Sequence, residues 1–164
     1  MLVAATASCS SNGVRTGEAL DVGSAWTLCQ ANGSEPKTFG QALLKNTTQS
    51  DVTLESAELI DAQGLEIVGA AIVPSDKKAN GLVWSQWPPA YPGAEETLKE
   101  EGQSVPGAVI KPAQTWFLWV GVRARTGAGS SGAVRVNYLH DGQELQQEVR
   151  YSLQIVAGKT CPEA

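Results

Sequence analysis

From Trp26 onward, short runs of alternating hydrophobic and polar residues are separated by turn residues about every eight to twelve positions, a spacing typical of β-sandwiches and barrels. Alternation at every second position is the pattern of a strand that buries one face. No window longer than about eight residues has the 3.6-residue hydrophobic period of an amphipathic helix. The pattern therefore predicts an all-β fold.

The strongest local prediction is a hairpin near the C-terminal end. Residues 134–138 alternate, Asp141-Gly142 provides the turn, and alternation resumes over residues 145–155. Both central residues of a type I′ turn need positive φ, which Asp and Gly tolerate better than most residues. A slip of one residue would turn one hydrophobic set outward, so a single register is expected. In that register the facing pairs are Tyr138 with Leu145, Val136 with Gln147, and Val134 with Val149.

A strand at 114–124 is hydrophobic on both faces. Its inward set is Trp116, Leu118, Val120 and Val122, and its outward set is Phe117 and Trp119. A strand with two hydrophobic faces is either central in its sheet or covered by another part of the chain. We expect the segment 126–132 that follows, which is rich in Gly and Ser, to be a mobile loop.

The first half of the chain predicts four further strands. They span residues 25–30, 38–45, 52–60 and 65–73, the last split by Gly69 and ended by Pro74. Asn46-Thr47-Thr48 matches a glycosylation sequon, but it lies between two predicted strands and we interpret it as a plain turn.

Between residues 75 and 114 the alternation stops. Trp84, Trp87 and Tyr91 lie among prolines, and the acidic run 95–101 predicts one or two helical turns starting near Pro92-Gly93. Long insertions between strands are often functional or mobile. Because aromatic side chains anchor interfaces and stack on flat ligands, these three aromatic residues are the candidate binding residues. The alternative is that their rings fold back over an open end of the sandwich.

The charge of the chain excludes one class of partner. The chain has 164 residues and a net charge of −5, and its basic residues are scattered. A nucleic-acid-binding protein needs a basic face, so we expect no nucleic acid as partner. No hydrophobic run reaches the ~18–20 residues of a membrane span, so we expect contact with a membrane only through a lipid anchor.

The N-terminal residues predict export, with two possible cleavage sites. Residues 2–7 are hydrophobic or small, like the end of a signal peptide. Cleavage after Ala5-Thr6-Ala7 would release a protein that starts at Ser8. Residues 5–9 also resemble a bacterial lipobox, in which Cys9 would carry the acyl chains of a membrane anchor, although lipoboxes most often have Leu where this chain has Thr6. A cytosolic protein with a small-residue N-terminus is the third interpretation.

The other two cysteines lie near opposite ends of the predicted fold. The first and last strands of a sandwich usually run close together, so a Cys29–Cys161 disulfide would close nearly the whole domain. Loop entropy puts the stabilisation from such a crosslink at about 5 kcal/mol. Two buried free thiols are the alternative, but the predicted export favours the disulfide. Cys9 would then be the remaining cysteine, which suits lipid attachment.

Together the predicted elements form an Ig-like antiparallel β-sandwich of seven or eight strands with a long irregular loop near 75–114. We expect a signal-peptide remnant at 1–8, a flexible tether at 9–24 and a single domain at 25–164. A cysteine in the first strand, a turn entering a central strand at 109–116, the 138–142 hairpin and a terminal cysteine carry a resemblance that spans residues 26–161. In these features the chain resembles exported Ig-like lipoprotein domains of GC-rich Gram-positive, actinobacterial-type bacteria. The resemblance implies the fold and an extracytoplasmic location.

Residues suited to catalysis or metal binding are few. His140 is the only histidine, and its place beside Asp141-Gly142 predicts a solvated turn residue. One His and one Met cannot form a copper site, and no Cys/His set has the spacing of a zinc site. The carboxylates at 95–101 would need a rigid cleft to act as a glycosidase pair, so we interpret them as a solvated face. We therefore expect no metal, no cofactor and no enzymatic activity.

The leading hypothesis is a non-enzymatic domain that acts through protein–protein contacts at the bacterial cell envelope, secreted or anchored by lipid. The alternative is a carbohydrate-binding module that stacks glycan on Trp84, Trp87 or Tyr91. A hydrolase that uses the acidic run is the third hypothesis.

The lipid anchor gives the first testable prediction. After expression in a bacterium that processes lipoproteins, the mature protein should start at Cys9 and carry two or three acyl chains. Intact-mass measurement of the membrane fraction checks this. An unmodified protein that starts at Ser8 or later would exclude the anchor.

Overall fold

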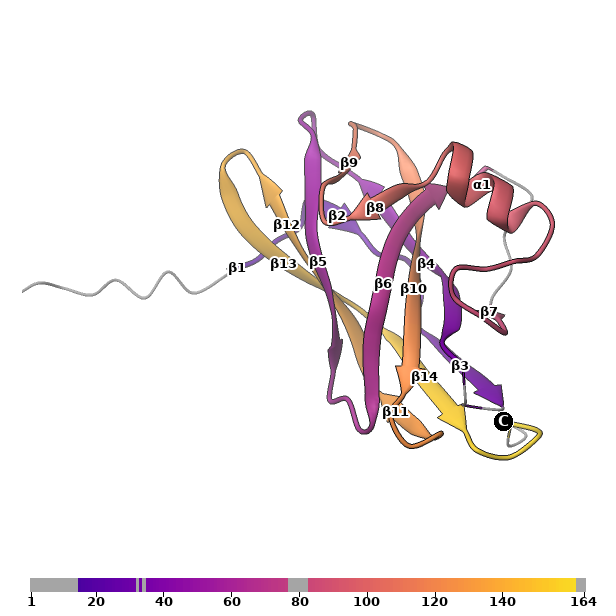
Figure 1. The fold of residues 1–164 in the computed structure, drawn as a ribbon. Coiled ribbons are helices and arrows are strands. Elements are labelled where there is room, and N and C mark those ends of the chain that lie inside the picture. The colour runs from indigo at the N-terminus through magenta and orange to yellow at the C-terminus, as the bar shows by residue number, and fades with distance from the viewer. Residues whose placement is uncertain (1–14, 32, 34, 77–82, 162–164) are drawn as a thin grey trace, which may run out of the picture.

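The computed structural model describes residues 15–31, 33, 35–76 and 83–161. Two β-sheets pack face to face around a hydrophobic core, and a third small sheet lies at one end (Figure 1). Cys9 and the expected signal-peptide remnant lie outside the described residues. The described part of the chain contains no helix long and hydrophobic enough to cross a membrane.

The strands form three sheets, named A, B and C here. Sheet A has the order β1 (Arg15–Thr16), β13 (Gln143–Val149), β12 (Ala133–His140), β5 (Val52–Ile60) and β9 (Ala108–Ile110). Sheet B has the order β2 (Leu20–Asp21), β4 (Lys37–Asn46), β10 (Thr115–Ala124), β6 (Leu65–Pro74) and β8 (Gln103–Val105), and β7 (Val83–Trp84) also pairs with β4. Sheet C has the order β11 (Gly129–Ser131), β14 (Tyr151–Val156) and β3 (Trp26–Ala31).

The strand order is that of an Ig-like sandwich. If β4, β5, β6, β10, β12 and β13 are lettered B to G in chain order, with β2 as part of A, sheet B runs A-B-E-D and sheet A contains G-F-C. This is the order of constant-type Ig domains. The predicted all-β Ig-like sandwich is therefore confirmed, and in the described part of the chain eight strands have six residues or more.

The predicted hairpin is confirmed in its register and its turn. Tyr138 pairs with Leu145, Val136 with Gln147 and Val134 with Val149. The φ angles of Asp141 and Gly142 are 49° and 74°, both positive as a type I′ turn requires. Val134, Val136, Tyr138 and Val149 all lie in the main core.

β10 is the central strand of sheet B, as its two hydrophobic faces predicted. It pairs with β4 on one side and β6 on the other. Leu118, Val120 and Val122 point into the main core, whereas Trp119 on the opposite face is fully buried in a second cluster. The outer face of sheet B is therefore covered by another part of the chain.

Three expectations need correction. Arg15–Asp21 was expected in the tether, but β1 and β2 pair with the two large sheets, and Ala19 and Leu20 are buried in the core. Segment 126–132 was expected to be a mobile loop, but β11 lies within it and pairs with β14. Residues 75–114 are more regular than expected, since they contain β7, the predicted short helix α1 (Ala94–Glu100), β8 and β9.

The disulfide is present and lies at one end of the sandwich. Cys29 in β3 is bonded to Cys161, which lies five residues after β14 ends at Val156. β3, which was the first strand predicted from the sequence, pairs in parallel with the last strand, β14, so the two lie side by side as the pairing required. The bond joins β3 to the C-terminal segment instead of crossing the core between sheets, which distinguishes it from the disulfide of an antibody domain.

The turn at Asn46 is held by a fully buried side chain. Asn46 Nδ2 donates to the carbonyls of Ser50 and Ile110, each at 2.8 Å, and its Oδ1 accepts from Thr48 N at 2.9 Å and Thr48 Oγ1 at 2.8 Å. A buried amide with every hydrogen bond made is a structural residue, so the sequon is part of a plain turn, as predicted.

Asn46→Ala should lower the free energy of unfolding by about 2–4 kcal/mol, because it leaves several buried groups without partners at about 1–3 kcal/mol each. Urea unfolding of the oxidised protein measures the change. Gln49→Ala, in the same turn but exposed, is the control and should change stability by less than about 0.5 kcal/mol. Equal effects of the two substitutions would contradict the role of Asn46.

Candidate functional site

The insertion between β6 and β10 covers the outer face of sheet B (Figure 1). β7 pairs antiparallel with β4, and α1 packs close to β6. Side chains of the insertion and of the outer face of sheet B form a second hydrophobic cluster, separate from the main core: Val73, Trp84, Trp87, Ala94, Leu98, Phe117 and Trp119.

Trp84 and Trp87 are half-buried in this cluster. The rings of Trp84 and Trp119 are 4.6 Å apart between centroids and tilted by 52°, a favourable aromatic arrangement. Trp84 therefore covers Trp119 and Trp87 packs in the same cluster, which corresponds to the alternative in which the rings fold back on the sandwich.

Trp87 lies in a slot made by two glycines. Gly69 of β6 and Gly121 of β10 pair directly across the sheet. A Cβ atom added to Gly121 would lie 2.3 Å from Trp87 Cγ, and one added to Gly69 would lie 2.5 Å from Trp87 Nε1. Only a residue without a side chain fits at either position. Gly69 was expected to split its strand, but β6 is continuous and has a β-bulge at the adjacent Val68.

Two residues of β4 hold the insertion by polar contacts. The Lys37 ammonium donates to the carbonyl of Ser85 at 3.0 Å, and the Thr38 hydroxyl donates to the carbonyl of Gln86. Lys37 is only 5% exposed, which is uncommon for lysine. This contact could not be predicted from the sequence, because a lysine at the start of a strand is usually solvated.

Tyr91 is the candidate residue that remains open to a ligand. The residue is 67% exposed, the largest value among the large hydrophobic residues in the described part of the chain. Its carbonyl accepts hydrogen bonds from Ala94 N at 3.0 Å and Glu95 N at 3.1 Å, so the start of α1 fixes its backbone. The ring is thus exposed beside the start of α1, in an insertion that is packed on the sheet.

The carboxylates of α1 lie on an exposed face. Glu95, Glu96 and Glu100 are exposed, as is Glu101 just after the helix. An acid–base pair needs a desolvated cleft, and these side chains lie on the surface. The geometry therefore favours the interpretation of a solvated face.

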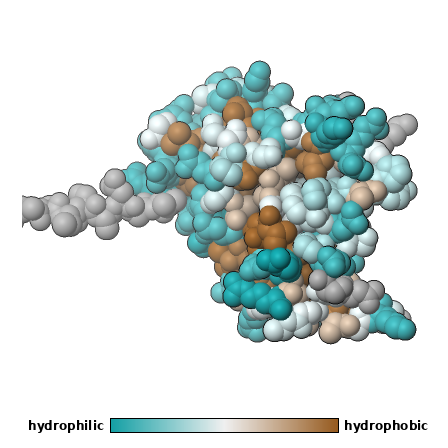
Figure 2. Space-filling model, viewed as in Figure 1, coloured by the Kyte–Doolittle hydropathy of each residue, from teal (hydrophilic) through white to brown (hydrophobic). Residues whose placement is uncertain are grey.

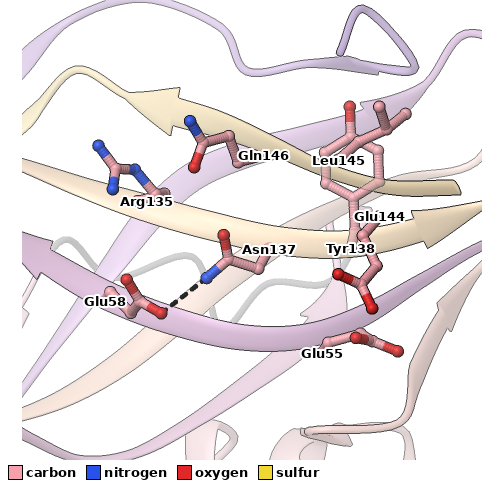
Figure 3. Close-up of a pocket in the computed structure, with 8 residues that line it drawn as sticks. All are labelled: Glu55, Glu58, Arg135, Asn137, Tyr138, Glu144, Leu145 and Gln146. Carbon is pink, nitrogen blue, oxygen red and sulfur yellow. Dashed lines mark hydrogen bonds between the residues drawn. The ribbon is translucent and has the colours of Figure 1, made fainter. Parts of the chain in front are cut away.

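A shallow pocket of about 320 Å³ lies on sheet A (Figure 3). Asn137 Nδ2 donates to Glu58 Oε1 at 2.7 Å, and Arg135 forms an ion pair with Glu148 at 2.6 Å. These two contacts pair Asn137 and Arg135 with carboxylates, and Glu55 and Glu144 add further negative charge to the lining, so the pocket is an open acidic surface. Its lining residues are Glu55, Glu58, Arg135, Asn137, Tyr138, Glu144, Leu145 and Gln146.

His140 is not solvated, contrary to the expectation. Its side chain is 17% exposed, and its Nε2 lies 2.9 Å from Ser50 Oγ, 3.1 Å from Thr48 Oγ1 and 3.6 Å from Asp141 Oδ2. In a Ser-His-Asp triad the Asp contacts the ring nitrogen opposite to the one that contacts Ser. Here all three contacts involve one nitrogen, so His140 joins two turns and does not form a triad.

Three ionisable groups have shifted pKa values with structural causes. Hydrogen bonds from Arg123 and Arg125 lower the pKa of Glu66. Burial raises the pKa of Tyr138 and of Tyr151. No group of three or more His, Cys, Asp or Glu residues that could hold a metal ion occurs in the described part of the chain.

No protein-family model matches the chain, and no curated protein matches it. Among solved structures, the ASH/PapD-like domain of human CEP192 (PapD-like domain 7) is similar over 97% of this chain and 99% of that chain, with 10% identity and a TM-score of 0.40. A similarity this weak supports no argument about function. The fold assignment rests on the strand order and packing described above.

Gly121→Ala should displace Trp87 from its slot and destabilise the protein by about 1–3 kcal/mol, the range for overpacked sites. Limited proteolysis should then cut within 85–93, and urea unfolding gives the loss of stability. Gly132→Ala is the control, because its added Cβ would meet no atom closer than 3.7 Å. An insertion as resistant to protease in Gly121→Ala as in wild type would contradict the slot.

Proposed function

We propose that the chain is a non-enzymatic Ig-like domain that acts through protein–protein contacts at the bacterial cell envelope, with Tyr91 and the outer face of α1 as a contact surface. The observation that carries the proposal is the 67% exposure of Tyr91 beside the start of α1, in an insertion that is packed on sheet B. Exposed aromatic residues on a preorganised base are typical anchors of protein interfaces, because little entropy is lost on binding.

The location outside the cytoplasm has separate support. The Cys29–Cys161 disulfide suits an oxidising compartment, in which such bonds form and persist. The signal-peptide-like residues 2–7 and the lipobox-like Cys9 support export or membrane anchoring. β1 joins sheet A, whereas the insertion packs on the outer face of sheet B, so a domain tethered through its N-terminus presents Tyr91 on the other layer of the sandwich.

The carbohydrate-binding alternative has less support from the geometry. Glycan stacking needs open ring faces, and Trp84 and Trp87 direct much of theirs toward Trp119 and the glycine slot. Tyr91 is the remaining platform. A glycan array in which wild type binds and Tyr91→Ala does not would favour this alternative over a protein partner.

A photo-crosslinking amino acid at position 91 tests the proposal in the native envelope. It should crosslink to a defined protein, whereas the same group at the exposed position 62 should not. Tyr91→Ala should leave the free energy of unfolding within about 0.5 kcal/mol of wild type, since the residue is exposed. Absence of a specific crosslink at 91 would contradict the proposed contact surface.

A further inference from the structure

The outer strands of the sandwich differ in how their edges are covered. In the two large sheets, each outer strand of six residues or more has a short strand paired along part of its edge: β1 on β13, β9 on β5, β2 and β7 on β4, and β8 on β6. β3 also has six residues and is outermost in sheet C. Within the described part of the chain, no strand pairs with its outer edge.

Among the described residues, no strand takes up the backbone groups on this edge. Trp26 N donates to the carbonyl of Arg150 at 2.9 Å, so the backbone groups of Trp26 point toward β14. Successive residues of a strand direct their N–H and C=O groups to opposite sides. The groups of Thr27, Cys29 and Ala31 therefore point to the free edge.

β3 also lacks the devices that usually protect an edge. Its residues Trp-Thr-Leu-Cys-Gln-Ala include no charge and no proline, and its register with β14 runs without a bulge. The strands β5 and β6 differ, because each contains a bulge, at Glu55 where β5 pairs with β12 and at Val68 where β6 pairs with β10. On the face shown in Figure 2, hydrophobic residues gather over β6 and the adjacent part of β5, and the bulges disrupt strand addition there.

Trp26 shows that the core layer is incomplete at this edge. It pairs with Tyr151 and alternates with Leu28, so it belongs to the core-facing set of β3. Tyr151 is 1% exposed and Leu28 is 7% exposed, but Trp26 is 47% exposed. The indole is therefore a hydrophobic surface beside an open row of hydrogen-bonding groups.

We propose that the outer edge of β3 is a docking site for an extended segment of a partner protein, which adds to sheet C as a fourth strand and packs a hydrophobic side chain on Trp26. Strand addition supplies affinity through main-chain hydrogen bonds and specificity through alternate side chains. The occupant is a peptide-like segment and not a second copy, since a six-residue edge is short for the ~1,600 Å² that a stable interface buries. The inference rests on the proposed role in protein contacts, but it concerns a different part of the chain from Tyr91.

Selection from a display library of random nine-residue peptides on the oxidised domain tests the proposal. The enriched peptides should alternate hydrophobic and polar residues. A synthetic enriched peptide should bind at least tenfold more weakly to Thr27→Pro, in which the proline removes an edge N–H that β14 does not use. Trp26→Ala should cause a similar loss, whereas Gln154→Ala, on the interior strand β14, is the matched control and should not.

Hydrogen exchange measured by NMR provides a readout without a natural partner. In the free domain the amides of Thr27 and Cys29 should exchange much faster than those of Leu28 and Gln30, and the peptide should protect them. Thermal unfolding of each variant confirms that the loss of binding does not come from unfolding.

Three results would overturn the proposal. They are protected amides at Thr27 and Cys29 in the free domain, equal peptide affinity for wild type and Thr27→Pro, or self-association that Thr27→Pro abolishes. The last result would assign the edge to a second copy of the chain. Crosslinking at position 91 should persist in Thr27→Pro, so failure at this edge is distinguishable from failure of the proposed function.

Discussion

The architecture depends on covering the outer face of β10. Trp119 lies on that face and is fully buried, and water contact with its side chain would forfeit roughly 4–6 kcal/mol at 25 cal/mol per Å². Sheet A packs on the inner face of sheet B and leaves the outer face, which carries Trp119, uncovered. The chain between β6 and β10 therefore has to return across that outer face. The second hydrophobic cluster, the glycine slot and the buried Lys37 all follow from this requirement.

This requirement also limits what the aromatic insertion can do. Trp84 and Trp87 are part of the fold, because their rings pack on Trp119 and on paired glycines. A substitution at Trp87 would therefore lower the stability of the fold, whether or not Trp87 also contacts a ligand. Tyr91 is not part of the cluster and is exposed. A substitution there can therefore change a binding contact without disturbing the packing on sheet B.

The features that sequence reasoning predicted have local or topological causes. Alternation and an Asp-Gly turn fix the register of the β12–β13 hairpin, and the pairing of β3 with the last strand, β14, allows the Cys29–Cys161 bond. The missed features depend on residues far apart in the chain. Gly69 and Gly121 form a slot only because their strands pair in one register, and β1 and β2 are two residues long, too short for any periodic signal. The prediction that His140 is solvated was wrong because its partners, Thr48 and Ser50, lie in a turn that is distant in the sequence.

The distribution of short strands extends this argument from the sheet faces to the sheet edges. Four short strands, β2, β7, β8 and β9, protect edges of long strands at β4, β6 and β5, and three of them belong to the same insertion that covers Trp119. One segment thus covers the outer face of sheet B and also pairs with part of the exposed edges of the two large sheets. The described strands of this segment do not pair with β3, whose conformation is fixed instead by the parallel ladder with β14 and by the bond to Cys161. The covalent bond holds this edge rigid, and no described strand pairs with it beside the half-exposed Trp26. The edge therefore combines preorganisation with unpaired hydrogen-bonding groups, the two properties that strand addition requires.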